Sequence, residues 1–433
     1  MDWRKKSVRN WGRLGMKFDV VQLESTGIDV IDGDRGKNYP HQNELLNTGF
    51  CLFLSAKNVT KLGFNFSETQ FISQRKDTLL NNGKLKRGDI VITTRGTVGN
   101  VALYSPQIFY DNVRINSGML IIRCTNNISN QYLYQVLRSE WFQKQIMAVQ
   151  SGSAQPQLPK SHFLKMYIPL PSLPIQEKIA SILQLIDDKV MTNNAINNNL
   201  SEQIKTICTA WLSNYAPFGG VLPDDWSKTS LSSIADFVSG YSYKGTELTE
   251  SNIAMATIKN FDRKGGFKLD GYKEIVPSSK LKDTQHAELF DTLVAHTDLT
   301  QNAEVIGNAE PVMSKSGYSD IVFSMDLVKV VPKNKHISKF LIAAILQDKT
   351  FKAHCLGYVN GTTVLHLSKK ALPEYQLYLP NDLSALKPLD ELVTALYQQI
   401  SANIEEITKL ETLRDTLLPK LMSGKLDVSN IEI

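Results

Sequence analysis

Polar side chains that can hydrogen-bond to DNA recur in short loops in both halves of this 433-residue chain. Arginine can pair with two acceptors of guanine, and asparagine or glutamine with adenine, whereas lysine, serine, threonine and free backbone amides hold phosphates. The candidates in the first half are Arg35, Lys37, Tyr39, Arg95, Thr97, Asn112, Arg114, Ser153 and Gln155. The candidates in the second half are Tyr241, Tyr243, Lys244, Lys259, Asn260, Arg263, Thr297, Thr300, Gln301, Thr362 and Thr363. The sequence therefore predicts a DNA contact surface in each half.

Each of these residues also has a simpler interpretation. An exposed arginine or lysine on a loop is usually only solvated, and a loop glycine usually serves a turn. The net charge of +5 permits nucleic-acid binding but does not require it. The prediction rests on the recurrence of the polar clusters in both halves.

The sequence lacks the common patterns of enzymes that act on DNA. It contains no G-x-x-x-x-G-K-[ST] loop, no Glu-x-Lys tripeptide and no Asn-Pro-Pro-Tyr or Asp-Pro-Pro-Tyr segment. The four cysteines are far apart without a C-x-x-C pair, which favours reduced thiols over a zinc site or disulfides. The pair Asp187 and Asp188 is expected on a solvated helix face. We therefore expect a non-catalytic chain with no cofactor or metal of its own.

One long internal repeat organises the chain. Four landmarks recur at an offset of 209 residues: a helical phenylalanine, a loop glycine, a proline ending an apolar segment, and a leucine late in a long helix. The pairs are Phe142 and Phe351, Gly152 and Gly361, Pro171 and Pro380, and Leu212 and Leu421. This period is too long for a solenoid, so it predicts a duplicated unit of one globular domain and one long helix. The alternative is two unrelated α/β domains with coincident turns.

Two long amphipathic helices are predicted, one ending each repeat. Apolar residues recur at steps of three and four over residues 175–211 and 389–421. A helix of about 37 residues is roughly 55 Å long, and a small domain cannot cover its whole apolar stripe. Each helix should therefore pack antiparallel against the other, with a globular domain at each end.

Several asparagines interrupt the predicted helical seams. Asn193 and Asn403 lie on or beside the apolar positions, where polar residues often fix helix register. The alternative for Asn193 is that it faces solvent. The asparagine-rich residues 193–199 form helix poorly, so a bend or frayed turn is expected there.

Short strands and helices are predicted in both globular domains. In the first, strands cover residues 89–93, 100–104 and 117–123, and a helix covers 130–149. In the second, strands cover residues 289–295 and 321–331, a polar loop covers 296–302, and a helix covers 338–359. The expected fold class is α+β, with two pseudo-symmetric α/β domains separated by two long antiparallel coiled-coil spacer helices.

Several segments together are typical of one protein family. They are IDGDRGKNYP at 31–40, LKRGDIVITTRGTVGN at 85–100, residues 151–157, 168–171, 176–180, 222–226 and 240–245, and LRDTLLPKLMSGKL at 413–426. Through them the chain resembles the specificity subunits of type I restriction-modification systems over essentially its whole length. One departure is HTDLT at 296–300, where the first half has its Arg95-Gly-Thr loop, so contacts cannot be transferred between halves.

The resemblance implies a cytoplasmic, non-membrane subunit that reads a bipartite site on double-stranded DNA. It implies target-recognition domains at 1–173 and 214–384, a central spacer helix at 174–213, and a C-terminal spacer helix with its tail at 385–433. The expected partners are two methyltransferase subunits, which would bind S-adenosylmethionine and methylate adenine, and restriction subunits, which would supply an ATP-dependent motor and nuclease. The alternatives are a protein-interaction scaffold without sequence-specific DNA binding and, with no motif to support it, an enzyme.

Overall fold

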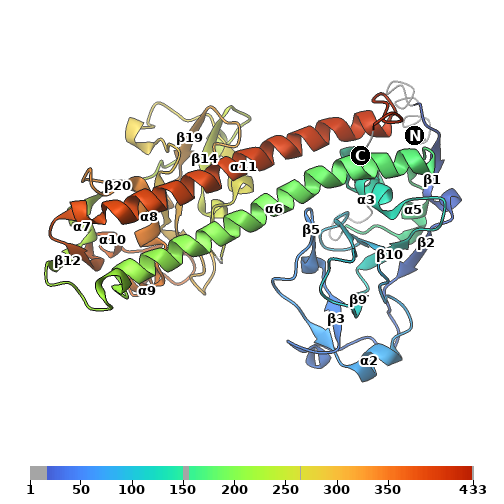
Figure 1. Cartoon of the computed structure of the whole chain (residues 1–433), viewed down its shortest axis with the longest axis horizontal. Coiled ribbons are helices and arrows are strands. Elements are labelled where there is room, and N and C mark those ends of the chain that lie inside the picture. The colour runs from blue at the N-terminus through green and yellow to red at the C-terminus, as the bar shows by residue number, and fades with distance from the viewer. Residues whose placement is uncertain (1–16, 150–155, 264, 432–433) are drawn as a thin grey trace. The chain divides into compact units, whose positions relative to one another are not determined.

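The chain folds into two compact units in the computed structural model, which describes residues 17–149, 156–263 and 265–431. The first unit contains Met1–Asp188 and Leu410–Ile433, and the second contains Lys189–Lys409. Two long helices, α6 (Leu173–Leu212, 40 residues) and α11 (Lys387–Met422, 36 residues), contribute to both units. They are the longest ribbons in Figure 1, green and orange-red respectively. Both long helices predicted from the apolar periodicity are therefore confirmed.

The first unit is built on a four-stranded antiparallel sheet in the order β2-β10-β7-β8. A second sheet, β6-β3-β9, pairs β3 with β9 in parallel, and β1 pairs with β11. The strands are β1 (Val20–Gln22), β2 (Asp29–Asp32), β3 (Cys51–Leu54), β4 (Val59–Thr60), β5 (Gly63–Phe64), β6 (Phe71–Ile72), β7 (Ile90–Thr93), β8 (Val101–Leu103), β9 (Val113–Ile115), β10 (Met119–Arg123) and β11 (Tyr167–Pro169). The shorter helices are α2 (Gln74–Leu79), α3 (Asn130–Arg138), α4 (Glu140–Val149) and α5 (Lys160–Leu164).

The second unit repeats this topology. Its antiparallel sheet has the order β13-β20-β16-β18, its mixed sheet has the order β15-β14-β19 with β14 parallel to β19, and β12 pairs with β23. The strands are β12 (Trp226–Ser230), β13 (Ala235–Ser239), β14 (Ile253–Ala256), β15 (Lys273–Glu274), β16 (Thr292–Ala295), β17 (Thr297–Asp298), β18 (Ala309–Pro311), β19 (Asp320–Phe323), β20 (Leu327–Pro332), β21 (Val359–Asn360), β22 (Leu365–Leu367) and β23 (Gln376–Pro380). The shorter helices are α7 (Leu231–Ile234), α8 (Lys339–Leu346), α9 (Lys349–Leu356) and α10 (Ala371–Glu374).

A matching pair of glycines supports the duplication at the level of single contacts. A Cβ atom on Gly33 would lie 2.1 Å from the carbonyl oxygen of Asn116, and one on Gly240 would lie 2.0 Å from that of Ser324. Both glycines directly follow the first strand of their four-stranded sheet, and both touch the loop that leads into the neighbouring strand. The equal strand orders and this shared close approach confirm two pseudo-symmetric domains over two unrelated ones.

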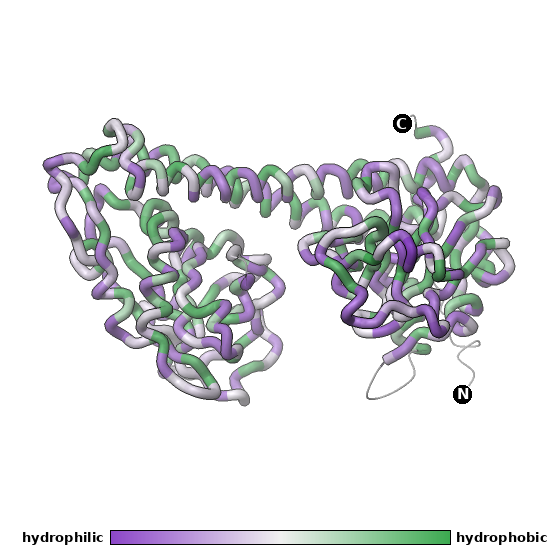
Figure 2. The backbone as a smooth tube through the Cα atoms, turned by 90° about the horizontal axis from the view of Figure 1, so that it is seen from below, coloured by the Kyte–Doolittle hydropathy of each residue, from purple (hydrophilic) through white to green (hydrophobic). Residues whose placement is uncertain are grey.

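Each unit has a hydrophobic core that includes segments of both long helices. In the first unit Leu183 of α6 and Leu421 of α11 are fully buried in one cluster with α3 and α4. In the second unit Ile204 of α6 shares a cluster with Leu389 and Val393 of α11. The start of α6 thus packs on the end of α11, and its end packs on the start of α11, as an antiparallel pair requires. Figure 2 shows green and purple alternating along the long helical run that is visible from below, as expected for an amphipathic helix.

The structure corrects several details of the sequence-based predictions. The helix predicted at 130–149 is broken at Ser139, because the Ser139 hydroxyl accepts from the Phe142 amide and so caps a new helix. The helix predicted at 338–359 is broken at Asp348, which caps α9 in the same way, and α9 ends at Leu356. The strand predicted at 321–331 is two strands, β19 and β20, which belong to different sheets. Residues 193–199 are continuous helix in spite of their asparagines.

Asn193 and Asn403 both lie inside the helix pair of the second unit. Asn193 is buried, and its Nδ2 donates to Glu406 Oε2 at 2.8 Å. Asn403 is also buried, and its Nδ2 donates to Asn197 Oδ1 at 2.7 Å. The predicted position on the helical seam is therefore confirmed for both asparagines, and the alternative that Asn193 faces solvent is excluded.

Asp187 is also buried, and the expectation of a solvated face for it is wrong. Its carboxylate accepts from Arg138 Nη1 at 2.7 Å and Gln135 Nε2 at 2.7 Å, both on α3, and from Arg414 Nη1 of α11 at 3.3 Å. Burial raises the pKa of this carboxyl, but the two arginines and Gln135 outweigh burial and hold the pKa below its ordinary value. Asp188, its neighbour in sequence, is exposed as predicted.

Candidate nucleic-acid interface

Three loops meet at one edge of the four-stranded sheet in the first unit. At this edge β2 and β7 end and β10 begins, which brings together residues 33–38, 94–100 and 116–118. The backbone amides of Thr94 and Arg95 both donate to the carbonyl oxygen of Gly118, at 2.7 and 3.2 Å. Arg35 reaches across to the carbonyl oxygen of Ser117 at 3.4 Å. Loops anchored in this way on rigid strands suit the presentation of recognition groups.

Arg95 has the most suitable geometry for ligand contact in the first unit. Its backbone is fixed by Gly118 and by a bridge to Gln157, while its side chain is exposed. The guanidinium has no hydrogen-bond or ion-pair partner among the described residues. Thr97, two residues along the same loop, is exposed as well. Ser153 and Gln155, which were predicted to act beside them, lie outside the described residues.

The loop after β2 is held by a buried carboxylate. Asp34 accepts hydrogen bonds from the backbone amides of Gly36 and Asn81, each at 2.8 Å. Burial raises the pKa of Asp34, but these backbone hydrogen bonds outweigh burial and lower the pKa overall. Arg35 and Lys37 are exposed on this loop, and Arg35 pairs with Asp32 at 3.0 Å. Asp34 thus fixes a loop that presents two cations.

Tyr39 and Asn112 are only half exposed. The ring of Tyr39 packs edge-on against that of Phe53, with 5.7 Å between the centroids. Asn112 precedes β9, and its carbonyl oxygen accepts from the amide of Leu52. Both residues have evident roles in packing or pairing, and neither is among the freely presented side chains.

Arg114 requires a correction, because the structure buries it. Its Nε donates to Asp77 Oδ1 at 2.5 Å, and its two terminal nitrogens donate to the carbonyl oxygens of Asn82, Asp77 and Leu80. Only 6% of its side chain is exposed. With all three of its guanidinium nitrogens bonded inside the protein, Arg114 is a structural residue and is not available to read DNA.

The second unit gathers loops at the corresponding edge of its own sheet. There β13 and β16 end and β20 begins, so residues 240–244, 296–308 and 324–326 are neighbours. Thr297 is buried, and its hydroxyl donates to Asp326 at 3.0 Å. Gln301 donates to the carbonyl oxygen of Thr362 at 2.7 Å and so joins the loop that carries the exposed Thr362 and Thr363. This edge therefore presents hydroxyl and amide groups where the first unit presents Arg95.

A second buried carboxylate, Asp298, organises this edge. It accepts from the amide and the hydroxyl of Thr300, each at 2.8 Å, and from the amide of Val305 at 2.6 Å. Burial raises the pKa of Asp298, and these hydrogen bonds lower it by more. Thr300 therefore serves the loop's own structure, as Thr297 does.

The aromatic and asparagine candidates of the second unit are mostly interior. The hydroxyl of Tyr241 is shared among Glu247 at 3.0 Å and Ser278 at 2.8 Å, and only 2% of this residue is exposed. Tyr243 packs on the same cluster. Asn260 is fully buried and bonds to the amide of Thr257 and the carbonyl oxygen of Lys268. The prediction of DNA contact is therefore corrected for Tyr241 and Asn260, whose polar atoms are used within the fold.

The three cations predicted to contact DNA in the second unit, Lys244, Lys259 and Arg263, are all exposed. Lys259 lies in a short turn whose sequence, TIKN, matches SAKN at residues 55–58. The buried asparagine that ends each turn caps it in the same way, since Asn58 bonds to the amide of Ser55 at 2.9 Å. Lys57 is consequently a counterpart of Lys259 that the predictions missed. The repeated tetrapeptide was the available signal.

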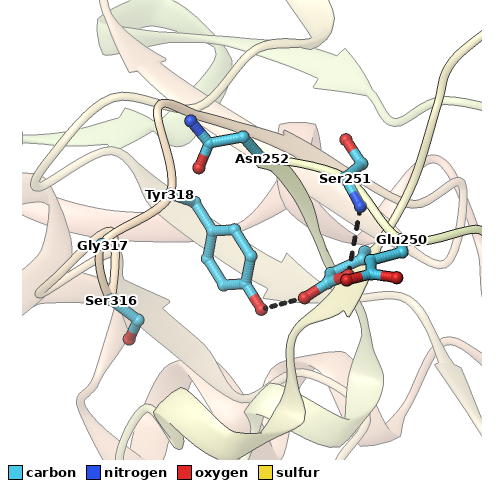
Figure 3. Close-up of a pocket in the computed structure, with 7 residues that line it drawn as sticks. Glu250, Ser251, Asn252, Ser316, Gly317 and Tyr318 are labelled. Carbon is cyan, nitrogen blue, oxygen red and sulfur yellow. Dashed lines mark hydrogen bonds between the residues drawn. The ribbon is translucent and has the colours of Figure 1, made fainter.

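One surface pocket of about 460 Å³ lies in the second unit, beside the N-terminal end of β14. The turn that carries Lys259 follows the other end of this strand. Its lining includes Glu250, Glu274 and Tyr318, and the Tyr318 hydroxyl donates to Glu274 at 3.3 Å (Figure 3). The carboxylate of Glu274 also accepts from the amide of Ser251 at 3.1 Å. Two carboxylates would repel a phosphate, so this pocket does not belong to the candidate DNA surface.

Neither a metal centre nor a membrane span is found within the part of the chain that the structure describes. No group of three or more potential metal ligands is present among those residues. No described helix is both long and apolar enough to cross a bilayer.

Comparison with known proteins gives matches over most of the chain. Residues 25–202 match the family described as "Type I restriction modification DNA specificity domain". The MjaIX specificity subunit of a type I restriction enzyme from Methanocaldococcus jannaschii is 22% identical over 368 residues, which cover 80% of this chain and 79% of that protein. The MjaVIII specificity subunit of the same organism is 23% identical and covers 73% of this chain and 75% of that protein.

Among solved structures, the fold is similar to that of a type I restriction-modification S subunit from M. genitalium. The TM-score is 0.55 at 16% identity, over 94% of this chain and 96% of that chain. At this identity the likeness concerns the fold, and it agrees with the two α/β units and two long helices described above.

Proposed function

The chain belongs to the specificity subunits of type I restriction-modification systems, and we propose that each of its two units reads one half of a bipartite DNA target. A subunit of this family determines which DNA target is recognised and is not itself catalytic. Cofactors are bound by the modification and restriction subunits of the complex. The chain is thus one part of an assembly with partner subunits.

The observation that carries the proposal is the repeated sheet edge. In both units the loops at the same edge of an equivalent four-stranded sheet present exposed polar or cationic side chains. In the second unit the segment after β14, which carries Lys259 and Arg263, contacts these loops through Asn308 and Glu304. We assign DNA contact to Arg35, Lys37, Arg95 and Thr97 in the first unit and to Lys244, Lys259, Arg263, Gln301, Thr362 and Thr363 in the second. Arginine and glutamine would read base edges, and the lysines and hydroxyls would hold phosphates.

The two sets differ in chemistry, and this favours an asymmetric target. Arg95 offers a guanidinium fork suited to guanine, whereas the equivalent edge of the second unit offers Gln301 and two threonines. The half-sites should therefore differ in base sequence. In this proposal the domain limits are residues 1–173 and 214–384, with α6 and α11 as spacers that set the gap between half-sites.

The assembly proposed for this chain has two methyltransferase subunits and acts on double-stranded DNA in the cytoplasm. The methyltransferase subunits would use S-adenosylmethionine to methylate adenine within the target. Restriction subunits would join them for ATP-dependent cleavage. These partners follow from the family, in which specificity subunits direct the catalytic subunits.

The test is to map N6-methyladenine across the genome of cells that express this chain with its methyltransferase partner. A two-part motif with a fixed gap is expected. Arg95→Ala should relax one half of the motif, and Gln301→Ala should relax the other. A motif that does not change in either variant contradicts the assignment, and methylation with no sequence preference favours a scaffold without sequence-specific binding.

A further inference from the structure

A chain of hydrogen bonds crosses the second unit from α11 to a basic surface turn. It starts at Tyr397 on α11, whose hydroxyl donates to Gln347 Oε1 at 2.7 Å. Gln347, at the end of α8, donates from its Nε2 to Glu310 Oε2 at 2.8 Å. The other oxygen of Glu310 accepts from the backbone amide of Gly266 at 2.6 Å. Three side chains thus connect a spacer helix with the turn whose described residues are 262, 263, 265 and 266.

The interior location of this chain makes its hydrogen bonds hard to replace. Glu310 is 5% exposed and Tyr397 is 3% exposed, so water cannot readily substitute for a lost partner. A buried carboxylate without partners is strongly destabilised, and both oxygens of Glu310 are satisfied only by Gly266 and Gln347 among the described residues. Removal of any one of these three side chains should therefore change the positions of the residues to which it is hydrogen-bonded.

The turn that Glu310 holds is also bonded to Asn308, the residue directly before β18. Asn308 donates from its Nδ2 to the carbonyl oxygen of Asp262 at 3.0 Å, and it lies two residues before Glu310. Lys352 on α9 contacts Asn308 Oδ1. At the exposed side of the turn, Arg263 pairs with Glu304 at 3.1 Å, with 66% of its side chain exposed. An exposed ion pair of this kind is weak and leaves the guanidinium available to a phosphate.

We infer that Glu310 is a positioning residue for DNA binding, which transmits the packing of α11 to the turn that carries Arg263. The inference rests on the proposed function, because it assigns Arg263 to the DNA surface. Glu310 itself touches no DNA. Its carboxylate fixes the Gly266 amide, and with it the direction in which Arg263 leaves the turn.

The test measures binding of the assembled methyltransferase complex to its mapped target duplex, as a function of salt, for three variants. Arg263→Ala removes the phosphate contact, Glu310→Ala removes the acceptor for Gly266, and Tyr397→Phe removes the distant end of the chain. Each should weaken binding by about threefold to tenfold, as expected for one hydrogen bond or phosphate contact. Arg263→Ala and Glu310→Ala should each lower the slope of log affinity against log salt by about 1.

The double variant Arg263→Ala with Glu310→Ala is decisive. If Glu310 acts through Arg263, the double variant binds as Arg263→Ala does, because the second change has nothing left to position. If Glu310 only stabilises the fold, the losses of binding free energy from the two changes add in the double variant. Glu310→Ala alone then leaves the slope of log affinity against log salt unaltered. Tyr358→Phe is the matched control, since it removes another tyrosine hydroxyl bond, to Glu374 at 2.7 Å, that lies outside this chain. It should leave affinity within about twofold of the original.

The outcomes separate this inference from the proposed function. A complex that does not prefer its mapped duplex over a scrambled one contradicts the proposed function itself. A specific complex in which Arg263→Ala weakens binding but Glu310→Ala and Tyr397→Phe do not overturns the inference alone. A specific complex in which Arg263→Ala has no effect also overturns it, because the turn then does not contact DNA. If Glu310→Ala does not fold, Tyr397→Phe decides the matter.

Discussion

At the scale of single residues, two arginines of the first unit illustrate how environment decides function. Arg95 follows β7 and Arg114 lies within β9, and both were predicted to contact DNA. Arg95 is exposed without a partner among the described residues, whereas Arg114 is buried on Asp77 and Lys84 lies on the other oxygen of that carboxylate. Burial raises the pKa of Asp77, but Lys84 and Arg114 lower it by more, so the carboxylate is kept charged.

The exchange of each arginine for alanine should separate binding from stability. Arg114→Ala leaves one oxygen of the buried Asp77 carboxylate and the carbonyl oxygens of Asn82 and Leu80 without the Arg114 donor, and it should lower the free energy of unfolding by about 3–5 kcal/mol. Arg95→Ala should change that free energy by less than about 0.5 kcal/mol, yet lower discrimination at one target position by about 1–3 kcal/mol. Urea-induced unfolding and duplex-binding titrations measure the two quantities. Equal losses of stability in both variants would contradict the assignment.

Glu310 predicts a particular dependence of stability on pH. Burial raises the pKa of its carboxyl to about 7, although Gly266, Gln347 and the charge of Lys205 act in the opposite direction. The folded state therefore favours the protonated form. Its contribution to stability is fully present below the ordinary glutamate pKa and is lost as the pH rises through about 7.

Glu310→Gln should remove this dependence, because glutamine does not titrate. Between pH 5 and pH 8 the free energy of unfolding of the original chain should fall relative to that of Glu310→Gln by about 2–3 kcal/mol. Urea unfolding at several pH values measures the difference. Glu288→Gln is the control, since Glu288 is exposed and a pairing with Lys315 lowers its pKa. A constant difference between the original chain and Glu310→Gln across this range would show that Glu310 does not titrate there.

At the scale of elements, Asp187 connects three helices of the first unit. It joins α3, through Arg138 and Gln135, to the segments of α6 and α11 that pack there. Removal of one partner from a buried ionic network leaves unpaired charge, in this case on Arg138, whereas Arg414 keeps its ion pair with Asp415 at 3.0 Å. The network therefore fixes how these helices align, in addition to their apolar contacts.

The adjacent aspartates provide a matched test of this network. Asp187→Ala should lower the free energy of unfolding by about 3–5 kcal/mol, because two largely buried guanidinium groups lose their shared carboxylate. Asp188→Ala should change it by less than about 0.5 kcal/mol, because Asp188 is exposed and accepts from Gln184 one turn away on the same helix. Thermal and urea unfolding measure both variants. Similar stabilities for the two would mean that the network contributes little.

Elements with strong periodic patterns were predicted well from sequence, because their signal depends on residues that are close together in the chain. The apolar spacing over residues 175–211 is a local property, and α6 covers it from Leu173 to Leu212. The offset of 209 residues likewise predicted two units of equal topology. Short strands such as β3 and β14 were missed, because strands of four residues depend on partners distant in sequence.

The candidate site was less predictable, because the composition of a loop does not reveal where its side chains point. Arg35, Arg95 and Arg263 are exposed as a recognition surface requires. Arg114, Tyr241 and Asn260 have equally suitable chemistry, yet the fold uses them to satisfy its own buried polar groups. Only tertiary hydrogen-bond partners distinguish these two classes of residue.

At the scale of the whole molecule, the continuity of α6 and α11 is the feature with the most direct consequence for target choice. Each helix contributes residues to both units without a break in its backbone pattern. In the proposed function, helix length therefore sets the gap between the half-sites that the two units read.

An insertion of four residues into each helix tests this role. Four residues add about one turn, or roughly 6 Å, and keep the apolar stripe nearly in phase, so the helix pair should still form. One base pair of DNA occupies about 3.4 Å, so the gap in the methylated motif should lengthen by one or two base pairs. Both half-sites should keep their sequences, because no recognition loop is altered.

The measurement is methyladenine mapping in cells with the lengthened chain. The control is a substitution of four helix residues by alanine at the same points. An unchanged gap would exclude the helices as the spacer, whereas altered half-sites would mean that the helices also orient the loops.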